Sequence, residues 1–167
     1  GDFRTKATKH MLRLNSPISL LNSVLYLIFC TQTNFVQSVA KALAERLELL
    51  SLTGLEIPPY FRVTSNALSA SLAKEWLGAG SLSSWLESGI GVHYGNLPDF
   101  VRNATEIDFR QRKLRVLIAT NTLAQRVNLP IRTVIIHSCR RYLEGRSERI
   151  PARDYWNIAG RAGRACE

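Results

Sequence analysis

The chain has 167 residues, 46% of them hydrophobic and 21% charged, which is typical of one folded domain and excludes a disordered or fibrous segment. A chain of this length can bury a core without disulfides or metals to hold it. The net charge is +9, and it is unevenly placed. Residues 1–109 carry nine basic and nine acidic side chains, whereas residues 110–167 carry thirteen and four. This asymmetry favours a polyanionic partner, either nucleic acid or nucleotide phosphate, with a solvated basic face as the alternative.

The cysteines and the longest apolar run indicate in which cellular compartment the protein is expected. The three cysteines are Cys30, Cys139 and Cys166. Their odd number and wide spacing favour reduced thiols in an intracellular protein, either cytoplasmic or in the nucleoid or nucleus. The apolar stretch 18–30 is interrupted by Asn22 and Ser23 and is too short to span a bilayer, so we expect no membrane partner.

The first half of the chain predicts one strand, one helix and a less regular region. Residues 1–17 are expected to be a linker ahead of one domain that spans 18–167. The β-prone run 24–29 predicts a buried strand. Helical spacing of apolar residues over 35–50 predicts a helix with Thr33 or Asn34 as its N-cap. Residues 51–89, broken by Pro58-Pro59, predict a helical insertion with short helices over 65–77 and 82–86.

In the second half, strands and helices alternate regularly. The predicted elements are a strand at 89–93, a helix at 98–110, a strand at 116–119, a short helix at 123–126, a strand at 134–136, an arginine-rich loop at 140–149 and a final helix from Pro151. Strands that alternate with helices in this way predict an α/β fold, namely an open, mostly parallel sheet with helices on both faces. Ligands bind such sheets at the carboxyl ends of the strands.

Polar residues follow the predicted strands. The segments are Thr31-Gln32-Thr33, His93-Tyr94-Gly95-Asn96, Thr120-Asn121-Thr122 and His137-Ser138. Hydroxyls, amides and free N–H groups at helix starts hold a sugar-phosphate backbone without reading its bases. Each segment alone would be an ordinary turn, but together they favour a phosphate-binding edge.

The sequence lacks the motifs of a phosphate loop, a dinucleotide-binding site and a metal site. The sequence contains no G-x-x-x-x-G-K-[ST], so it has no phosphate loop of its own. Gly89, Gly91 and Gly95 do not have the spacing of a dinucleotide site. The histidines are scattered along the sequence, with no paired carboxylates or neighbouring cysteines, so we expect no metal site.

The closing stretch DYWNIAGRAGRACE places Arg161 and Arg164 among glycines. Each glycine costs a helix interior about 1 kcal/mol against alanine, so helix stability does not explain Gly160 and Gly163. Small neighbours leave guanidinium forks uncovered for bidentate binding of phosphate. The alternative is a helix end with a capping glycine and favourable positive charge.

Four segments in order resemble motifs IV, IVa, V and VI of the second RecA-like domain of superfamily-two helicases. They read YLIFCT (26–31), HYGNLP (93–98), VLIATNTLAQRVNLP (116–130) and NIAGRAGR (157–164). The branch they resemble most is the DExH-box group of exosome-associated RNA helicases and archaeal repair helicases. The resemblance covers about residues 20–164, and 51–89 match poorly.

The resemblance implies the C-terminal half of an ATP-dependent helicase or translocase, a P-loop NTPase fold without its own P-loop. ATP with Mg²⁺ would be held mainly by an N-terminal RecA-like domain of the same chain, and the other partner would be single-stranded or unwinding DNA or RNA. The implied residues fall into three groups. They are Arg161 and Arg164 as catalytic arginines, Asn128, Asn157 and Gly160 at ATP, and Thr31, Thr33, His93, Asn96, Thr120, Asn121 and Thr122 at nucleic acid. The fragment alone would be inactive, because half of the ATP site is absent.

The sequence departs from the family pattern in three places. Arg126 replaces the usual glycine, Asn157 replaces glutamine or histidine, and residues 31–33 lack the arginine that often follows motif IV. Arg126 and Asn157 favour an alternative, a non-catalytic module that binds nucleic acid or protein, whereas the presence of both Arg161 and Arg164 counts against it.

Overall fold

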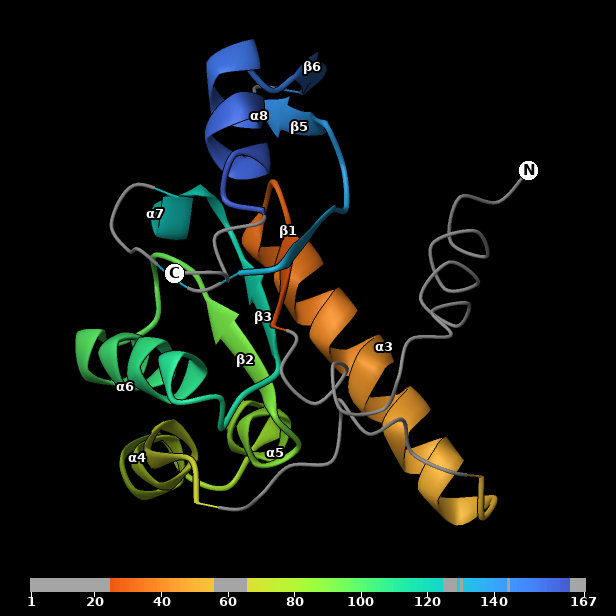
Figure 1. The fold of residues 1–167 in the computed structure, drawn as a ribbon, viewed down its shortest axis with the longest axis vertical. Helices are drawn as coiled ribbons and strands as arrows, with labels where there is room; N and C mark the ends of the chain where they lie inside the picture. Colours follow the sequence, from red (N-terminus) through yellow and green to blue (C-terminus); the bar gives the residue numbers. More distant parts are fainter. Residues whose placement is uncertain (1–24, 56–65, 125–128, 130, 144, 163–167) are drawn as a thin grey trace.

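The computed structural model describes residues 25–55, 66–124, 129, 131–143 and 145–162 (Figure 1). The expected linker 1–17 and the Pro58-Pro59 break lie outside them. In chain order the elements are β1 (Tyr26–Phe29), α3 (Thr33–Leu52), α4 (Leu68–Leu77), α5 (Ser81–Glu87), β2 (Ile90–His93), α6 (Asp99–Arg110), β3 (Val116–Ala119), α7 (Asn121–Ala124), β4 (Thr133–Ile136), β5 (Arg140–Leu143), β6 (Arg146–Arg149) and α8 (Ala152–Ala159). Among the described helices, none is both long and apolar enough to cross a membrane.

The central sheet has four parallel strands in the order β2-β3-β1-β4, which confirms the predicted α/β architecture. Strands β1, β2 and β3 are buried along their whole length, as expected of parallel strands covered on both faces. The strands are level with one another, because Phe29 pairs with Ala119 and Ile136, and His93 pairs with Ala119. Their carboxyl ends therefore meet at one edge of the sheet, which we call the carboxyl edge.

Alternate strand residues face two separate hydrophobic layers. Leu27 and Leu117 point to the layer formed with α4 and α6, where Phe109 is fully buried. Ile28 and Ile118 point to the opposite layer, which α3 covers. The sheet is thus enclosed between helices, and the two layers alternate along each strand with the period of two that strand geometry imposes.

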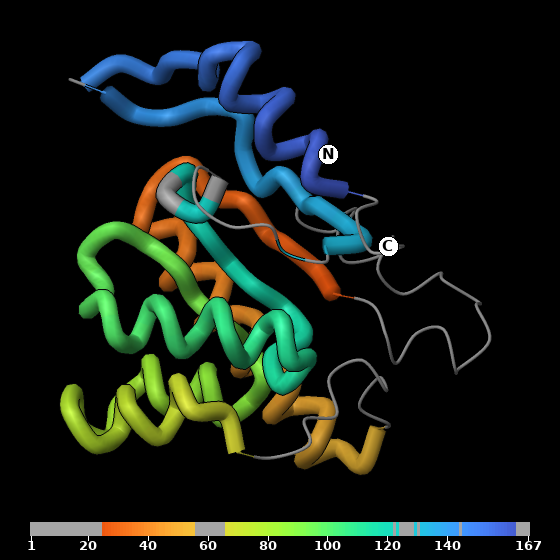
Figure 2. The backbone as a smooth tube through the Cα atoms, turned by 60° about the vertical axis from the view of Figure 1, so that its left-hand side comes forward, coloured from red at the N-terminus to blue at the C-terminus, as the bar shows by residue number. Residues whose placement is uncertain are grey.

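The hairpin formed by β5 and β6 is the main departure from the sequence-based predictions. Residues 140–149 were expected to form a loop, but Arg141 pairs with Glu148 and Leu143 with Arg146 in an antiparallel ladder. The turn contains Gly145, whose φ of +77° suits glycine. Figure 2 shows the hairpin and α8 together at one end of the molecule, away from α4 and α5.

Several helix boundaries also differ from the predictions. Gln32, rather than Thr33 or Asn34, is the N-cap of α3, and Thr33 is the first helical residue. Helix α7 begins at Asn121, two residues earlier than expected, so it starts directly at the carboxyl edge. Helix α8 ends at Ala159, and the glycine–arginine motif begins just beyond it.

A buried carboxylate joins α4 to α6. Asp108 is fully buried, and its Oδ2 accepts hydrogen bonds from the backbone N–H and the hydroxyl of Ser69, both at 2.7 Å. Its Oδ1 lies 3.6 Å from the Nζ of Lys113. The N-cap of α4 is Ala67, which offers no capping group. Asp108 therefore satisfies an N–H at the start of α4 from another helix, where the helix dipole also favours negative charge.

This contact predicts a large loss of stability in Asp108→Ala. Removing the acceptor leaves Ser69 unsatisfied at a buried helix end, so we expect unfolding to require about 3 kcal/mol less than in the wild type. Asp99→Ala on the same helix is the control, because the Asp99 side chain is 80% exposed. We expect it to cost below about 1 kcal/mol. Guanidinium unfolding compares the three proteins, and equal stability of the two variants would contradict the assignment.

Candidate nucleotide and nucleic-acid interface

The carboxyl edge is linked by backbone hydrogen bonds just beyond the strands. The donors are the N–H groups of Cys30, Thr120 and His137, and the acceptors are the carbonyls of Ala119, His93 and Phe29, at 2.8, 3.0 and 2.9 Å respectively. The parallel ladder therefore continues past each strand by one residue, and it fixes where the following polar segments begin.

Four of the predicted nucleic-acid residues start the segments at this edge. Thr33 begins α3 and Asn121 begins α7, both half-buried, and Thr120 precedes Asn121. Asn96 is exposed in the loop after β2. Thr122 lies in α7, and its side chain is outside the described part of the structure. First-turn N–H groups of helices suit phosphate oxygens, which agrees with the expected use of this edge.

Thr31 has a different contact from the one expected. Its hydroxyl donates a hydrogen bond of 2.9 Å to the carbonyl of Arg140 in the hairpin. A hydroxyl has one proton to donate, so Thr31 in this arrangement holds β5 and has none left for a phosphate oxygen.

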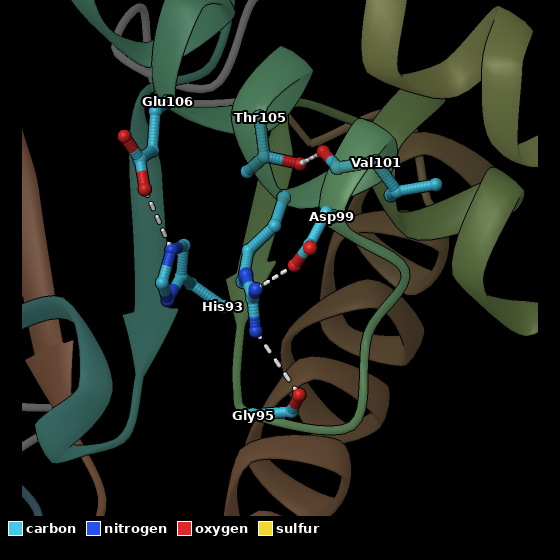
Figure 3. A network of polar contacts seen from close by, with 7 residues as sticks. His93, Gly95, Asp99, Val101, Thr105 and Glu106 are labelled. Carbon is cyan, nitrogen blue, oxygen red and sulfur yellow. Dashed lines mark hydrogen bonds and ion pairs between the residues drawn. The ribbon is translucent and has the colours of Figure 1, made fainter.

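His93 is buried inside the domain rather than presented to a ligand (Figure 3). Its side chain is 2% exposed, and Nε2 lies 2.8 Å from the Glu106 Oε1 on α6. Burial is the largest influence and lowers the pKa of His93 below 6.5. Glu106 opposes this shift and Arg102 adds to it. The ring is therefore neutral at neutral pH and donates its Nε2–H to Glu106, so we no longer place His93 at the nucleic acid.

The loop after β2 is held by Arg102 of α6. Its guanidinium donates to the carbonyl of Gly95 at 3.0 Å and also pairs with Asp99 (Figure 3). These contacts fix the segment that carries Asn96. The exposed amide of Asn96 is thus displayed by a loop whose base is tied to a helix.

The hairpin gives the carboxyl edge a basic surface. Arg140, Arg146 and Arg149 are exposed on it. Arg140 is oriented within the hairpin, because its guanidinium donates to the hydroxyl and the carbonyl of Ser147 at 2.8 and 3.0 Å. The positive charge that the sequence placed in the C-terminal third is therefore partly gathered on one small hairpin.

Helix α8 brings the first part of the glycine–arginine motif, up to Ala162, close to α7. Ile158 is 1% exposed and anchors the helix, and α8 contacts α7. Asn157 is exposed, and Arg161 is half-buried in the turn after Ala159. A Cβ on Gly160 would lie 3.0 Å from the carbonyl oxygen of Trp156, so this position suits glycine. Asn128, Arg126 and Arg164 lie outside the described residues.

Gln32 belongs to the polar segment 31–33 that the sequence places at this edge, but it was not among the predicted site residues. Its amide donates a hydrogen bond of 3.1 Å to the carbonyl of Tyr142, 110 positions further along the chain. The only local signal was a glutamine directly before a helix, where serine, threonine, asparagine or aspartate is preferred.

The fold is that of an α/β domain of the RecA-like class, and the sequence contains no phosphate loop. The sequence pattern of the helicase conserved C-terminal domain matches residues 63–166. The chain therefore belongs to that family, the C-terminal domain of superfamily-two helicases.

Three relatives of the chain illustrate how much of each protein it matches. It is 30% identical to the DExH-box ATP-dependent RNA helicase DExH11 of Arabidopsis thaliana over 164 residues, which is 98% of this chain and 12% of that protein. It is 43% identical to the ATP-dependent DNA helicase Hel308 of Aeropyrum pernix over 83 residues, 50% of this chain and 11% of that protein. It is 34% identical to the Hachiman protein HamB of Bacillus cereus over 141 residues, 83% of this chain and 12% of that protein. The chain thus spans only a small part of the length of these relatives.

The buried His93 predicts a pH dependence of stability. Its pKa in the folded chain is lower than in the unfolded chain, so the unfolded chain binds the proton first and stability falls as the pH drops below about 6.5. We expect His93→Gln to reduce this fall, since glutamine keeps a donor for Glu106 and does not titrate. Guanidinium unfolding at about pH 7.5 and about pH 5.5 measures the difference. Equal losses in both proteins would assign the effect to another group.

Proposed function

We propose that the chain is the C-terminal half of an ATP-dependent helicase or translocase that moves along DNA or RNA. The observation that carries the proposal is the contact between α7 and α8 at the carboxyl edge. Helix α7 begins in the segment that resembles motif V, and α8 leads into the segment that resembles motif VI. Two segments separated in the sequence are therefore adjacent in space, at the edge where α/β sheets bind ligands.

The catalytic part of the proposal concerns the end of α8. ATP with Mg²⁺ is held mainly by an N-terminal RecA-like domain of the parent chain, and Arg161 and Arg164 reach its phosphates. Arginine fingers stabilise the charge of the transition state in phosphoryl transfer and are worth about 10³–10⁵ in rate. Asn157, Gly160 and Asn128 complete the nucleotide contacts. The anchored helix and the turn after Ala159 support this role for Arg161, because a finger must be held in place to act.

The nucleic-acid part of the proposal concerns the carboxyl edge. Thr33, Asn96, Thr120, Asn121 and Thr122 contact the sugar-phosphate backbone, and the arginines of the hairpin add positive charge. Such contacts read no bases, so binding is tolerant of sequence and weakens steeply with salt. The names of two relatives, a DNA helicase and an RNA helicase, support a nucleic-acid strand as the partner but do not decide between DNA and RNA.

The test is ATP hydrolysis by the parent protein with and without single-stranded DNA and RNA. We expect Arg164→Ala and Arg161→Ala each to lower strand-stimulated turnover more than about 100-fold, at unchanged folding and strand affinity. Arg153→Ala is the matched control, because Arg153 is an exposed arginine on α8 outside the motif. We expect it to change turnover less than about threefold.

Two results would contradict the proposal. Turnover that survives in the Arg161 and Arg164 variants would remove their catalytic role. A parent protein with no strand-stimulated hydrolysis would favour the alternative, a helicase-like module that binds nucleic acid or protein without turnover.

A further inference from the structure

Gln32 occupies the N-cap of α3 but does not cap it. Its carbonyl accepts the first bond of the helix, from the N–H of Val36 at 3.3 Å, yet its side chain makes no capping hydrogen bond. The side-chain amide instead donates to the carbonyl of Tyr142 at 3.1 Å. A shorter polar residue would satisfy the helix end better, so the choice of glutamine requires another explanation.

The junction between β1 and α3 holds the hairpin at neighbouring points. Thr31 binds the carbonyl of Arg140, and Gln32 binds that of Tyr142, two residues further along β5. Alternate carbonyls of a strand point to the same side, so the side chains of Thr31 and Gln32 donate hydrogen bonds to the same edge of β5. A third contact links the same helix to the segment before the hairpin: the ring of Phe35 on α3 lies against that of His137, with the ring centroids 5.4 Å apart.

The hairpin lies directly before α8 in the chain, but it buries little of its own surface. Only Ile150 and Pro151 separate the end of β6 from the start of α8. Tyr142 is 66% exposed and Leu143 47%, so burial contributes little to holding β5. The orientation of the hairpin therefore depends strongly on the contacts made by the β1–α3 junction, whereas α8 is anchored separately by Ile158.

We propose that Gln32 is a positioning residue that holds the hairpin against the carboxyl edge and so strengthens the binding of nucleic acid by the arginines of the hairpin. This inference rests on the proposed function. The contact of Gln32 is exposed, and an exposed hydrogen bond stabilises a fold no more than a good helix cap does. Stability alone thus gives no advantage to glutamine here, whereas positioning the arginines of the hairpin does.

The experiment replaces Gln32 by serine in the full-length parent protein. Serine can cap α3 but cannot reach Tyr142, so we expect thermal stability equal to or above that of the wild type. Basal ATPase should not change. The KM for poly(U) or poly(dT) in stimulated hydrolysis should rise about fivefold or more, with kcat within about twofold. Amide hydrogen exchange over 140–149 should become faster.

Two further variants isolate the contact. Gln32→Met keeps the size of the side chain without its donor, and it should raise the KM as serine does. Gln37→Ser makes the same change at an exposed position of α3, and it should leave the KM unchanged.

The outcomes separate this inference from the function on which it rests. An unchanged KM in a strand-stimulated enzyme overturns the positioning role alone, as does a raised KM that appears only together with lost stability. A wild-type parent with no strand-stimulated hydrolysis overturns the proposed function, and the positioning role with it.

Discussion

The level register of the four parallel strands is the constraint on which the rest of this domain depends. Phe29 pairs with residues at the ends of both neighbouring strands, so every strand stops at the same edge. A shift of one residue in the pairing of β3 would bring Arg115 or Thr120, which flank its apolar run 116–119, into the buried sheet. The polar residues at the ends of the run therefore fix the register. The position of the candidate interface is therefore a consequence of packing.

Two kinds of stabilisation operate in different parts of the molecule. The sheet and its helices are held by burial and by the carboxylate of Asp108, which joins α4 to α6. The hairpin is held by its own ladder, by Thr31 and by Gln32, with its large side chains exposed. Contacts of the second kind are weaker and more easily exchanged, which suits a surface that must respond to a ligand. The buried sheet and its helices thus fix the position of the carboxyl edge, and the hairpin is attached to that edge by weaker contacts.

The sequence predicted the buried elements well and the exposed ones poorly, for physical reasons. Strand β3 was predicted over the residues where it occurs, because a run of Val, Leu, Ile and Ala has few alternatives between turns. The hairpin was missed because its strands bury nothing and show no apolar alternation. Its one signal was Gly145 between two polar segments. The pairing of His93 with Glu106 was unpredictable, since it depends on how α6 crosses the end of β2.

Local packing explains why glycine occurs at positions 91 and 160. Gly91 lies in β2 where a Cβ would come 2.9 Å from Leu117 and 3.3 Å from Thr105 of α6, so glycine lets α6 pack closely on the sheet. Gly160 lies where a Cβ would crowd the carbonyl of Trp156, and its N–H continues the bonding of α8. The sequence explained Gly160 by close approach to a nucleotide. The structure adds a local reason, the crowding against Trp156 in the turn that leads to Arg161. Under the proposed function the two explanations are compatible, because a motif that delivers an arginine to another domain must end its own helix at a defined place.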